Sequence, residues 1–341
     1  MERGVRQGDP SSTLLFNLVL NEALDEVRTI WDRRGYGTEV GVSCLRKPRL
    51  THVAFADDCT LVARSWISLK RMILQLREAL QRRGLSLHPT KCQVQTNVSS
   101  WNTRGDVSLE ERFSISFLTD EAPLEVLGTR FALRDVTQLE VRHRIAMGWR
   151  SFWSMKALLL NHGTSIRKRL RLFDSTVGSC VLWCASSWTP RVEELRLLQS
   201  AKRTMLRKIV GQKRAPDEDF VPWIQRVTHK AENEAASAGV KDWIREQGRM
   251  KWQWAGHVAR RPADSWLWRV TTWRDAEWQE SANQGGASRP LRPSTRRWMK
   301  WEDSLRRYCS EERLGSWLTL SSRRDTWASH AEAFAEWSMI C

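Results

Sequence analysis

The chain has 341 residues, a formal net charge of +16 and a pI near 10.1, so it is a basic protein long enough for two or three domains. Its hydrophobic content of 41% is typical of a globular protein and excludes a disordered chain. No uncharged apolar run reaches the roughly 18 residues of a membrane span, and the charged residues 1–10 exclude a secretory signal. We therefore expect an intracellular protein that contacts no membrane and binds a polyanion, with nucleic acid as the first candidate.

The positive charge and the tryptophans are concentrated in the C-terminal part of the chain. Residues 1–135 hold 19 of the 55 Lys and Arg residues and 17 of the 39 Asp and Glu residues, which gives +2 there and +14 in the remainder. Three of the 20 tryptophans precede residue 136. We infer that the two parts have different functions.

The seven cysteines are scattered, which does not predict a disulfide framework. Cys180 and Cys184 are four residues apart on a predicted helix, but no CxxC pair or paired histidine accompanies them. Buried thiols are the interpretation that we prefer to a zinc site.

The first predicted element is a helix over about residues 10–30. Asp9 can cap this helix, and Pro10 stands at the first helical position, where proline is tolerated. Its apolar face is predicted to comprise Leu14, Leu15, Leu18 and Val19.

Residues 51–64, THVAFADDCTLVAR, predict a β-hairpin, because two short β-prone runs flank the two-residue step Asp57-Asp58. The acidic pair is expected at or beside the hairpin tip. Adjacent carboxylates repel each other when ionised, so a divalent cation is a natural partner. Taken alone, however, an Asp-Asp step in a hairpin is usually only a turn.

The next predicted element is a helix with Leu69, Ile73, Leu76 and Leu80 at helical spacing and Gly84 as its C-cap glycine. A short strand is predicted at Leu85–Leu87, followed by strands and loops to about residue 131. Beyond residue 135 the pattern predicts amphipathic helices over 136–161, 164–184 and 191–210. After a break near 211–222, residues 223–280 are mostly helical, 281–296 form a basic linker and a last helix starts near Trp298.

Four short motifs occur in an order that resembles reverse transcriptases. Residues 3–17 contain RGVRQGDP and LLFN, which resemble the family's B motif, and about forty residues later FADD at 55–58 resembles the C motif. Gly84-Leu85 with Lys91 is similar to the D motif, and Leu127-Gly128 to the E motif, or primer grip. The order and spacing of the four make the resemblance specific.

The C-terminal part also resembles reverse transcriptases of endonuclease-bearing, LINE-type non-LTR retrotransposons. Residues 169–189 and 205–211 resemble the thumb region of these proteins. Residues 251–261, KWQWAGHVARR, and the strings at 289–303 resemble segments downstream of the polymerase. The resemblance therefore covers nearly the whole chain.

This resemblance implies an α+β fold with three parts. They are a partial reverse-transcriptase palm of antiparallel sheet and helices at 1–134, a helical thumb at 135–212 and a basic, Trp-rich helical extension at 213–341. The implied activity is RNA-directed DNA synthesis with two Mg²⁺ ions, an RNA template, a DNA primer and dNTPs. Asp57 and Asp58 are the implied catalytic metal ligands. Such a protein acts in the nucleus or in a cytoplasmic ribonucleoprotein.

The same resemblance implies nucleotide or template contacts for Arg3, Gln7, Gly8, Pro10, Phe55 and Lys91, and the primer grip for Leu127 and Gly128. Gly8 has no Cβ, so its backbone can approach a base pair. Gln7 offers both a donor and an acceptor. The alternatives are a core position for Phe55 in its strand and a solvated surface lysine at Lys91.

The alternating Trp and Arg residues of the C-terminal part predict binding of single-stranded nucleic acid, with rings stacked on bases and guanidinium groups on phosphates. We assign this role to Trp252, Trp254, Arg260 and Arg261. The alternative, which holds for any single tryptophan, is helix packing.

The sequence departs from the family pattern in one consequential way. Family members need a third carboxylate from an A motif that precedes the B motif, and no residue of this sequence precedes Met1. We therefore expect the chain alone to be inactive, and a non-catalytic nucleic-acid-binding remnant of a retrotransposon is the alternative function. Smaller departures, which suggest a drifting copy, are Ser11, Thr13, His88 and Val126.

Overall fold

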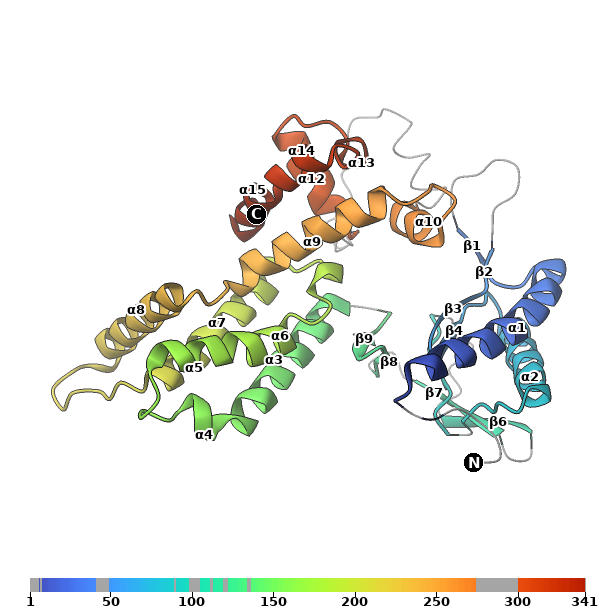
Figure 1. Ribbon diagram of the computed structural model, residues 1–341, viewed down its shortest axis with the longest axis horizontal. Coiled ribbons are helices and arrows are strands. Elements are labelled where there is room, and N and C mark those ends of the chain that lie inside the picture. Colours follow the sequence, from blue (N-terminus) through green and yellow to red (C-terminus); the bar gives the residue numbers. More distant parts are fainter. Residues whose placement is uncertain are drawn as a thin grey trace. The chain divides into compact units, whose positions relative to one another are not determined.

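The computed structural model describes residues 6, 8–40, 49–88, 90–97, 105–110, 113–118, 122–133, 136–273 and 300–340. Helices and small sheets make up these ranges, which confirms the predicted α+β class (Figure 1). The chain divides into two compact units, Met1–Arg134 with Thr272–Ala287 and Asp135–Thr271 with Ser288–Cys341. Within the described ranges, no helix combines the length and the apolar character needed to cross a bilayer.

The first helix, α1, runs over Pro10–Arg34, four residues beyond its predicted end. It stops at Gly35, whose φ of 67° is left-handed and suits glycine. The predicted apolar face is wrong, because Leu14, Leu15 and Leu18 are exposed. The buried face instead consists of Leu20, Ala23, Leu24, Val27 and Trp31. This face, to which Phe16 also belongs, lies against a packing partner, whereas Leu14, Leu15 and Leu18 lie about half a turn away around the helix.

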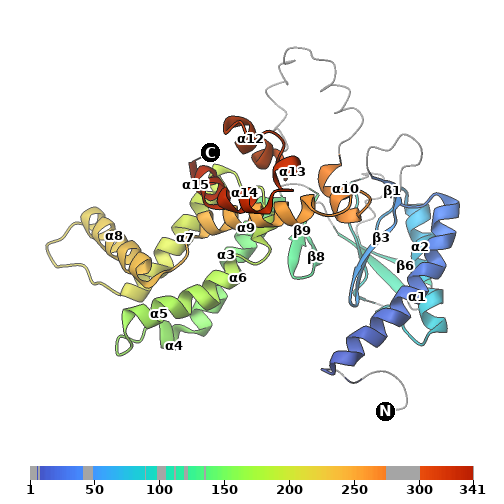
Figure 2. The same ribbon diagram turned by 45° about the horizontal axis from the view of Figure 1, so that its top comes forward.

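That partner is α2, Trp66–Arg82, and the two helices share one hydrophobic core. Figure 2 shows the N-terminal turns of α1 extending past the end of α2. The predicted C-cap glycine is confirmed, since Gly84 has a φ of 74° and the Leu85 N–H donates to the Leu80 carbonyl. The strand predicted at Leu85–Leu87 is wrong. Leu85 and Leu87 pack against the helical core as irregular chain.

The strands of this unit form four small sheets rather than one. They are β1 Thr38–Glu39 with β2 Arg49–Leu50; β3 His52–Phe55 with β4 Asp58–Leu61; β5 Gln93–Val94, β7 Phe113–Phe117 and β6 Gly105–Glu110 in that order; and β8 Leu124–Val126 with β9 Thr129–Phe131. The β5–β7 pair is parallel and the other pairs are antiparallel. A second core under the three-stranded sheet joins Ile73 of α2 to Val94, Phe113 and Ile115.

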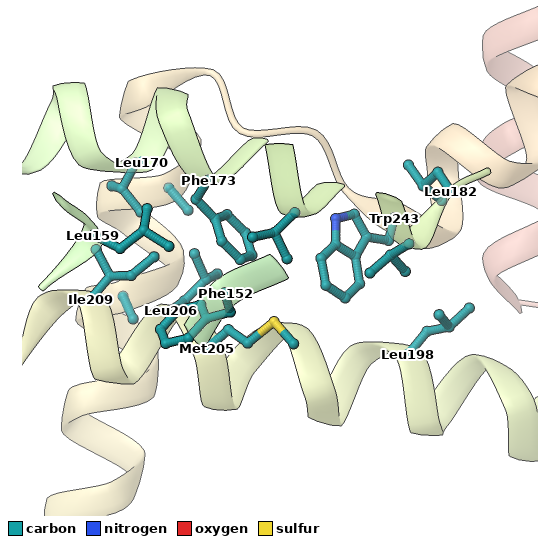
Figure 3. Packing of buried hydrophobic residues seen from close by; sticks show 14 of the residues in the cluster. Phe152, Leu159, Leu170, Phe173, Leu182, Leu198, Met205, Leu206, Ile209 and Trp243 are labelled. Carbon is teal, nitrogen blue, oxygen red and sulfur yellow. The ribbon is translucent and has the colours of Figure 1, made fainter. Parts of the chain in front are cut away.

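The second unit begins with a helical bundle. Its elements are α3 Val136–Ser154, α4 Lys156–Leu159, α5 Ile166–Phe173, α6 Ser179–Val181, α7 Val192–Val210 and α8 Phe220–Ala238. The helix predicted at 191–210 is confirmed as α7. Those predicted at 136–161 and 164–184 are interrupted, the latter by a π-helical turn at Asp174–Gly178 and by Cys184 with a left-handed φ of 56°. Figure 3 shows the bundle core, in which Phe152, Phe173, Met205 and Trp243 meet.

The unit ends with a second helical cluster built on α9. Its elements are α9 Trp243–Ala259, α10 Trp266–Thr272, α12 Asp303–Glu311, α13 Trp317–Leu320, α14 Arg324–Ser329 and α15 Ala331–Ile340. Its core contains Trp252, Tyr308, Trp317, Trp327 and Phe334. The predicted linker at 281–296 and the helix start near Trp298 lie outside the described residues.

Candidate functional site

The predicted acidic hairpin is the β3–β4 pair. Its register pairs His52 with Leu61 and Phe55 with Asp58, so the turn consists of Ala56 and Asp57. The turn is thus one residue earlier than the predicted Asp57-Asp58 step, and Asp58 is the first residue of β4. Ala56 has a left-handed φ of 50°, which a tight two-residue connection requires. Both aspartates nevertheless lie at or beside the tip, as predicted.

One face of the hairpin is held against the helices. Cys59 and Leu61 pack on the core shared by α1 and α2, and the His52 ring meets Trp31 edge-on at 5.8 Å between centroids. Burial raises the pKa of the Cys59 thiol to about 11. Cys59 is therefore a packing residue beside the acidic pair, because a thiol with this pKa stays protonated at neutral pH.

The opposite face and the tip are open. Val53 and Phe55 are 56% and 66% exposed, and both aspartates are exposed. The alternative of a core position for Phe55 is therefore wrong. Carboxylate oxygens are the hard ligands that Mg²⁺ prefers, so the tip suits a divalent cation. In the part of the chain that the structure describes, no group of three His, Cys, Asp or Glu residues could hold a metal ion. Asp57 and Asp58 thus supply only part of a coordination shell.

The segment before α1 is fixed by an N-cap. The Asp9 carboxylate accepts hydrogen bonds from the Ser11 N–H at 2.8 Å and the Ser11 hydroxyl at 2.5 Å, and these bonds lower the Asp9 pKa. Gly8 has a φ of 90°, and a Cβ built there meets no atom within 4 Å. Glycine is therefore required here for its backbone angle, and the space beside it is open. Pro10 is the first residue of α1, and Arg3 and Gln7 lie outside the described residues.

The remaining predicted polymerase residues lie in two further turns. Lys91 is exposed and precedes Cys92, whose carbonyl accepts the Ser116 N–H of β7. Leu127 and Gly128 form the tip of the β8–β9 hairpin with φ of 50° and 71°, as a two-residue type I′ connection requires. Their proposed contacts with nucleotide and primer stay predictions.

The N-terminal part of the chain is similar to a known protein family. Residues 1–131 match the family described as reverse transcriptase (RNA-dependent DNA polymerase). The matched residues include both the acidic hairpin and the capped segment before α1.

Several proteins similar to this chain come from transposable elements. An uncharacterized transposon-derived protein of Caenorhabditis elegans is 25% identical over 283 residues, 82% of this chain and 94% of the relative. Pol polyproteins of R2 retrotransposable elements are 34% identical over 98 residues in Nasonia vitripennis and 37% over 90 residues in Drosophila melanogaster. These two matches cover 29% and 26% of this chain but only 9% and 8% of the polyproteins. No solved structure gives a significant match.

The second predicted interface, on α9, is corrected by the structure. Trp252 is fully buried, and its ring stacks on Trp327 with centroids 3.8 Å apart and planes 5° apart. A nucleic-acid base therefore cannot reach Trp252, which is a packing residue. Trp254, by contrast, is 40% exposed, and Arg260 and Arg261 are exposed as well. These three keep the predicted nucleic-acid role as a proposal.

Proposed function

We propose that the first unit is part of the catalytic domain of an RNA-directed DNA polymerase of a non-LTR retrotransposon. In this proposal residues 1–134 form part of the palm and 135–212 the thumb. The observation that carries it is the exposed Asp57-Asp58 pair at the tip of a hairpin within the segment that matches the reverse transcriptase family. The R2 relatives, which are retrotransposon Pol polyproteins, support the non-LTR assignment.

The chemistry assigned to this chain's residues follows from the geometry of the tip. Asp57 and Asp58 would hold Mg²⁺, which lowers the pKa of a bound hydroxyl and stabilises charge on a leaving pyrophosphate. The hairpin orients both carboxylates because its other face is fixed to α1 and α2 through Cys59 and Leu61. Phe55 is paired with Asp58 and offers an exposed ring beside it, where a nucleotide sugar or primer end would lie.

Two carboxylates do not complete a two-metal site, in which the ions are about 3.5–4 Å apart and share a bridging ligand. By resemblance, the third carboxylate comes from an A motif that precedes the segment at residues 3–10. We propose that Asp57 and Asp58 support Mg²⁺-dependent extension when an A-motif strand supplies the third carboxylate.

The test is primer extension on an RNA template by this chain fused at its N-terminus to a palm segment that carries the A-motif aspartate. Extension should depend on Mg²⁺ and should be abolished by Asp57→Ala. The matched control is Asp25→Ala, which removes an exposed aspartate of α1 and should leave the rate unchanged. Equal extension by the Asp57→Ala and Asp25→Ala proteins would contradict the proposed function.

A second candidate function is nucleic-acid binding without catalysis, and the net charge of +14 beyond residue 135 favours it. Phosphate contacts release counterions, so affinity should fall steeply with salt and depend little on sequence. Titration of the full chain with labelled RNA and DNA oligonucleotides at two salt concentrations tests this. Tight binding that ignores salt, or no binding at low salt, would rule it out.

A further inference from the structure

A basic cavity lies on the second unit between α9 and the segment that forms α14 and the start of α15. Its volume is about 620 Å³, and its polar lining comprises Gln253, His257, Arg260, Arg261 and Arg324. No carboxylate belongs to this lining in the described part of the chain. Arg324 lies 63 residues beyond Arg261 in the sequence, so no single motif could indicate that the two line one cavity.

The arginines of this cavity differ from those at the other end of α9. There, Arg245 pairs with Glu332 and Glu336, and Arg249 pairs with Glu332, so these ion pairs join α9 to α15. Arg249 also pairs with Glu246 within α9. Packing between helices therefore explains Arg245 and Arg249.

The cavity arginines have no such explanation. The Arg260 guanidinium donates to the Ser321 carbonyl at 3.3 Å, and Arg261 donates to the His257 ring. Within the described ranges, neither of them nor Arg324 forms an ion pair with a carboxylate. Three positive charges thus surround one cavity without an internal counterion, which is the arrangement expected of a site for an external anion.

Two stacked and hydrogen-bonded tryptophans form the wall behind these charges. The Trp252 Nε1–H donates to the Trp327 carbonyl at 2.8 Å, and the Trp327 Nε1–H donates back to the Trp252 carbonyl at 3.2 Å. A Cβ at Gly256 would clash with the Trp327 indole, so only glycine admits this stack. The string WAGHVARR therefore divides into packing residues, such as Gly256, and exposed residues, such as His257 and Arg261, that packing does not explain.

An exposed aromatic ring adjoins the cavity. Trp254 is 40% exposed and stacks on His257, with centroids 5.2 Å apart and planes 23° apart. Because His257 also lines the cavity, the Trp254 ring lies beside the basic surface. An aromatic ring next to a cationic groove is the combination by which proteins bind unpaired bases together with their phosphates.

We propose that this cavity is a binding site for single-stranded nucleic acid, in which Arg261 and Arg324 contact phosphates and a base stacks on Trp254. The site rests on the nucleic-acid-binding function proposed for the C-terminal part and does not require the polymerase site. A base inside a duplex is already stacked on its neighbours, so Trp254 favours single strands.

The test measures binding of the full chain over a range of salt concentrations. The probes are a labelled RNA single strand, a labelled DNA single strand and a DNA duplex of the same sequence. The double variant Arg261→Gln/Arg324→Gln should lower single-strand affinity about tenfold and reduce the salt slope by about 1.4, at about 0.7 per phosphate contact. The control Lys213→Gln/Arg214→Gln removes the same charge from an exposed loop and should change the affinity less than twofold. Trp254→Ala should reduce the preference for single strands over duplex.

The outcomes separate this site from the general binding function. If the parent chain binds and the cavity variant loses no more affinity than the loop control, the site is wrong although nucleic-acid binding stands. If the parent chain does not bind at low salt, both proposals fail. Unequal affinities for RNA and DNA of the same sequence would show which strand the site prefers. Retention of the far-ultraviolet circular dichroism spectrum excludes misfolding of the variants.

Discussion

Phe55 and Asp58 lie opposite each other at the closed end of the β3–β4 hairpin, and both side chains are exposed. Side chains of directly paired residues project from the same face of a sheet. The phenyl ring therefore adjoins one carboxylate of the acidic pair without covering it. A substrate bound at the tip would contact both residues.

Phe55→Ala should consequently reduce activity and not stability. In the fused protein, we expect extension at low dNTP concentration to fall on the order of tenfold, the equivalent of one lost aromatic contact. The free energy of unfolding should change by less than about 0.5 kcal/mol, because a ring that is 66% exposed contributes little packing. Val53→Ala, an exposed control on the same strand, should leave both quantities unchanged. A loss of about 3–5 kcal/mol for Phe55→Ala would instead indicate a core residue.

Replacing the two α9 tryptophans, Trp252 and Trp254, should have different effects on stability. Trp252→Ala should destabilise the second unit by about 3–5 kcal/mol, because it removes a buried ring that also donates a hydrogen bond. Gly256→Ala should destabilise it as well, since the added methyl group displaces the Trp327 indole. Trp254→Ala should cost less than about 1 kcal/mol. Urea denaturation followed by circular dichroism measures all three, and equal losses for Trp252→Ala and Trp254→Ala would contradict the packing described.

Lys251 should make the stability of the second unit depend on pH. Its ammonium group is fully buried, where it donates to the Trp188 carbonyl at 3.2 Å and lies 5.5 Å from the Trp301 ring. Burial lowers the pKa of Lys251 to about 7. Between pH 7 and about 10 the unfolded chain therefore binds more protons than the folded one, and stability rises with pH.

Replacing the lysine isolates this contribution. From pH 7 to pH 9 the parent should gain on the order of 2 kcal/mol relative to Lys251→Met. The comparison is needed because the buried Cys309 thiol, whose pKa is raised to about 11, acts in the opposite direction above about pH 8. Urea titrations of both proteins at the two pH values give the difference. Parallel pH profiles would show that Lys251 is not deprotonated in the fold.

The sequence predicts the structure correctly where the chemistry of neighbouring residues determines it. The cap by Asp9, the proline at position 10, the glycine after α2 and the acidic hairpin each depend on a few neighbouring residues, and all four are found. The hairpin turn lies one residue earlier than predicted, because Ala56 adopts a left-handed conformation that alanine rarely takes.

Features that depend on distant partners could not be read from the sequence. The sequence of α1 does not reveal which of its apolar residues face α2, and its pattern places Leu14 and Leu18 on the buried face although both are exposed. The identical side chains Trp252 and Trp254 differ in burial because Trp327, 75 residues away, covers one of them. For the same reason Arg324 could not be placed beside Arg261.

We propose that Asp57 binds the catalytic metal ion, and a change of ligand type tests this role most directly. In the fused protein, Asp57→Cys replaces a hard oxygen ligand by a thiolate, which binds Mg²⁺ poorly and softer ions better. We predict that extension on RNA falls at least about a hundredfold with Mg²⁺, since small displacements of a catalytic group have this cost. Extension should recover in part with Mn²⁺ or Cd²⁺.

The parent protein and Asp25→Cys, measured in the same ions, provide the controls. Both should keep their Mg²⁺ activity and gain nothing specific from the softer ions. Recovery confined to Asp57→Cys would establish Asp57 as a metal ligand of a polymerase site. Full activity of Asp57→Cys with Mg²⁺, or a loss that neither Mn²⁺ nor Cd²⁺ reverses, would contradict the account.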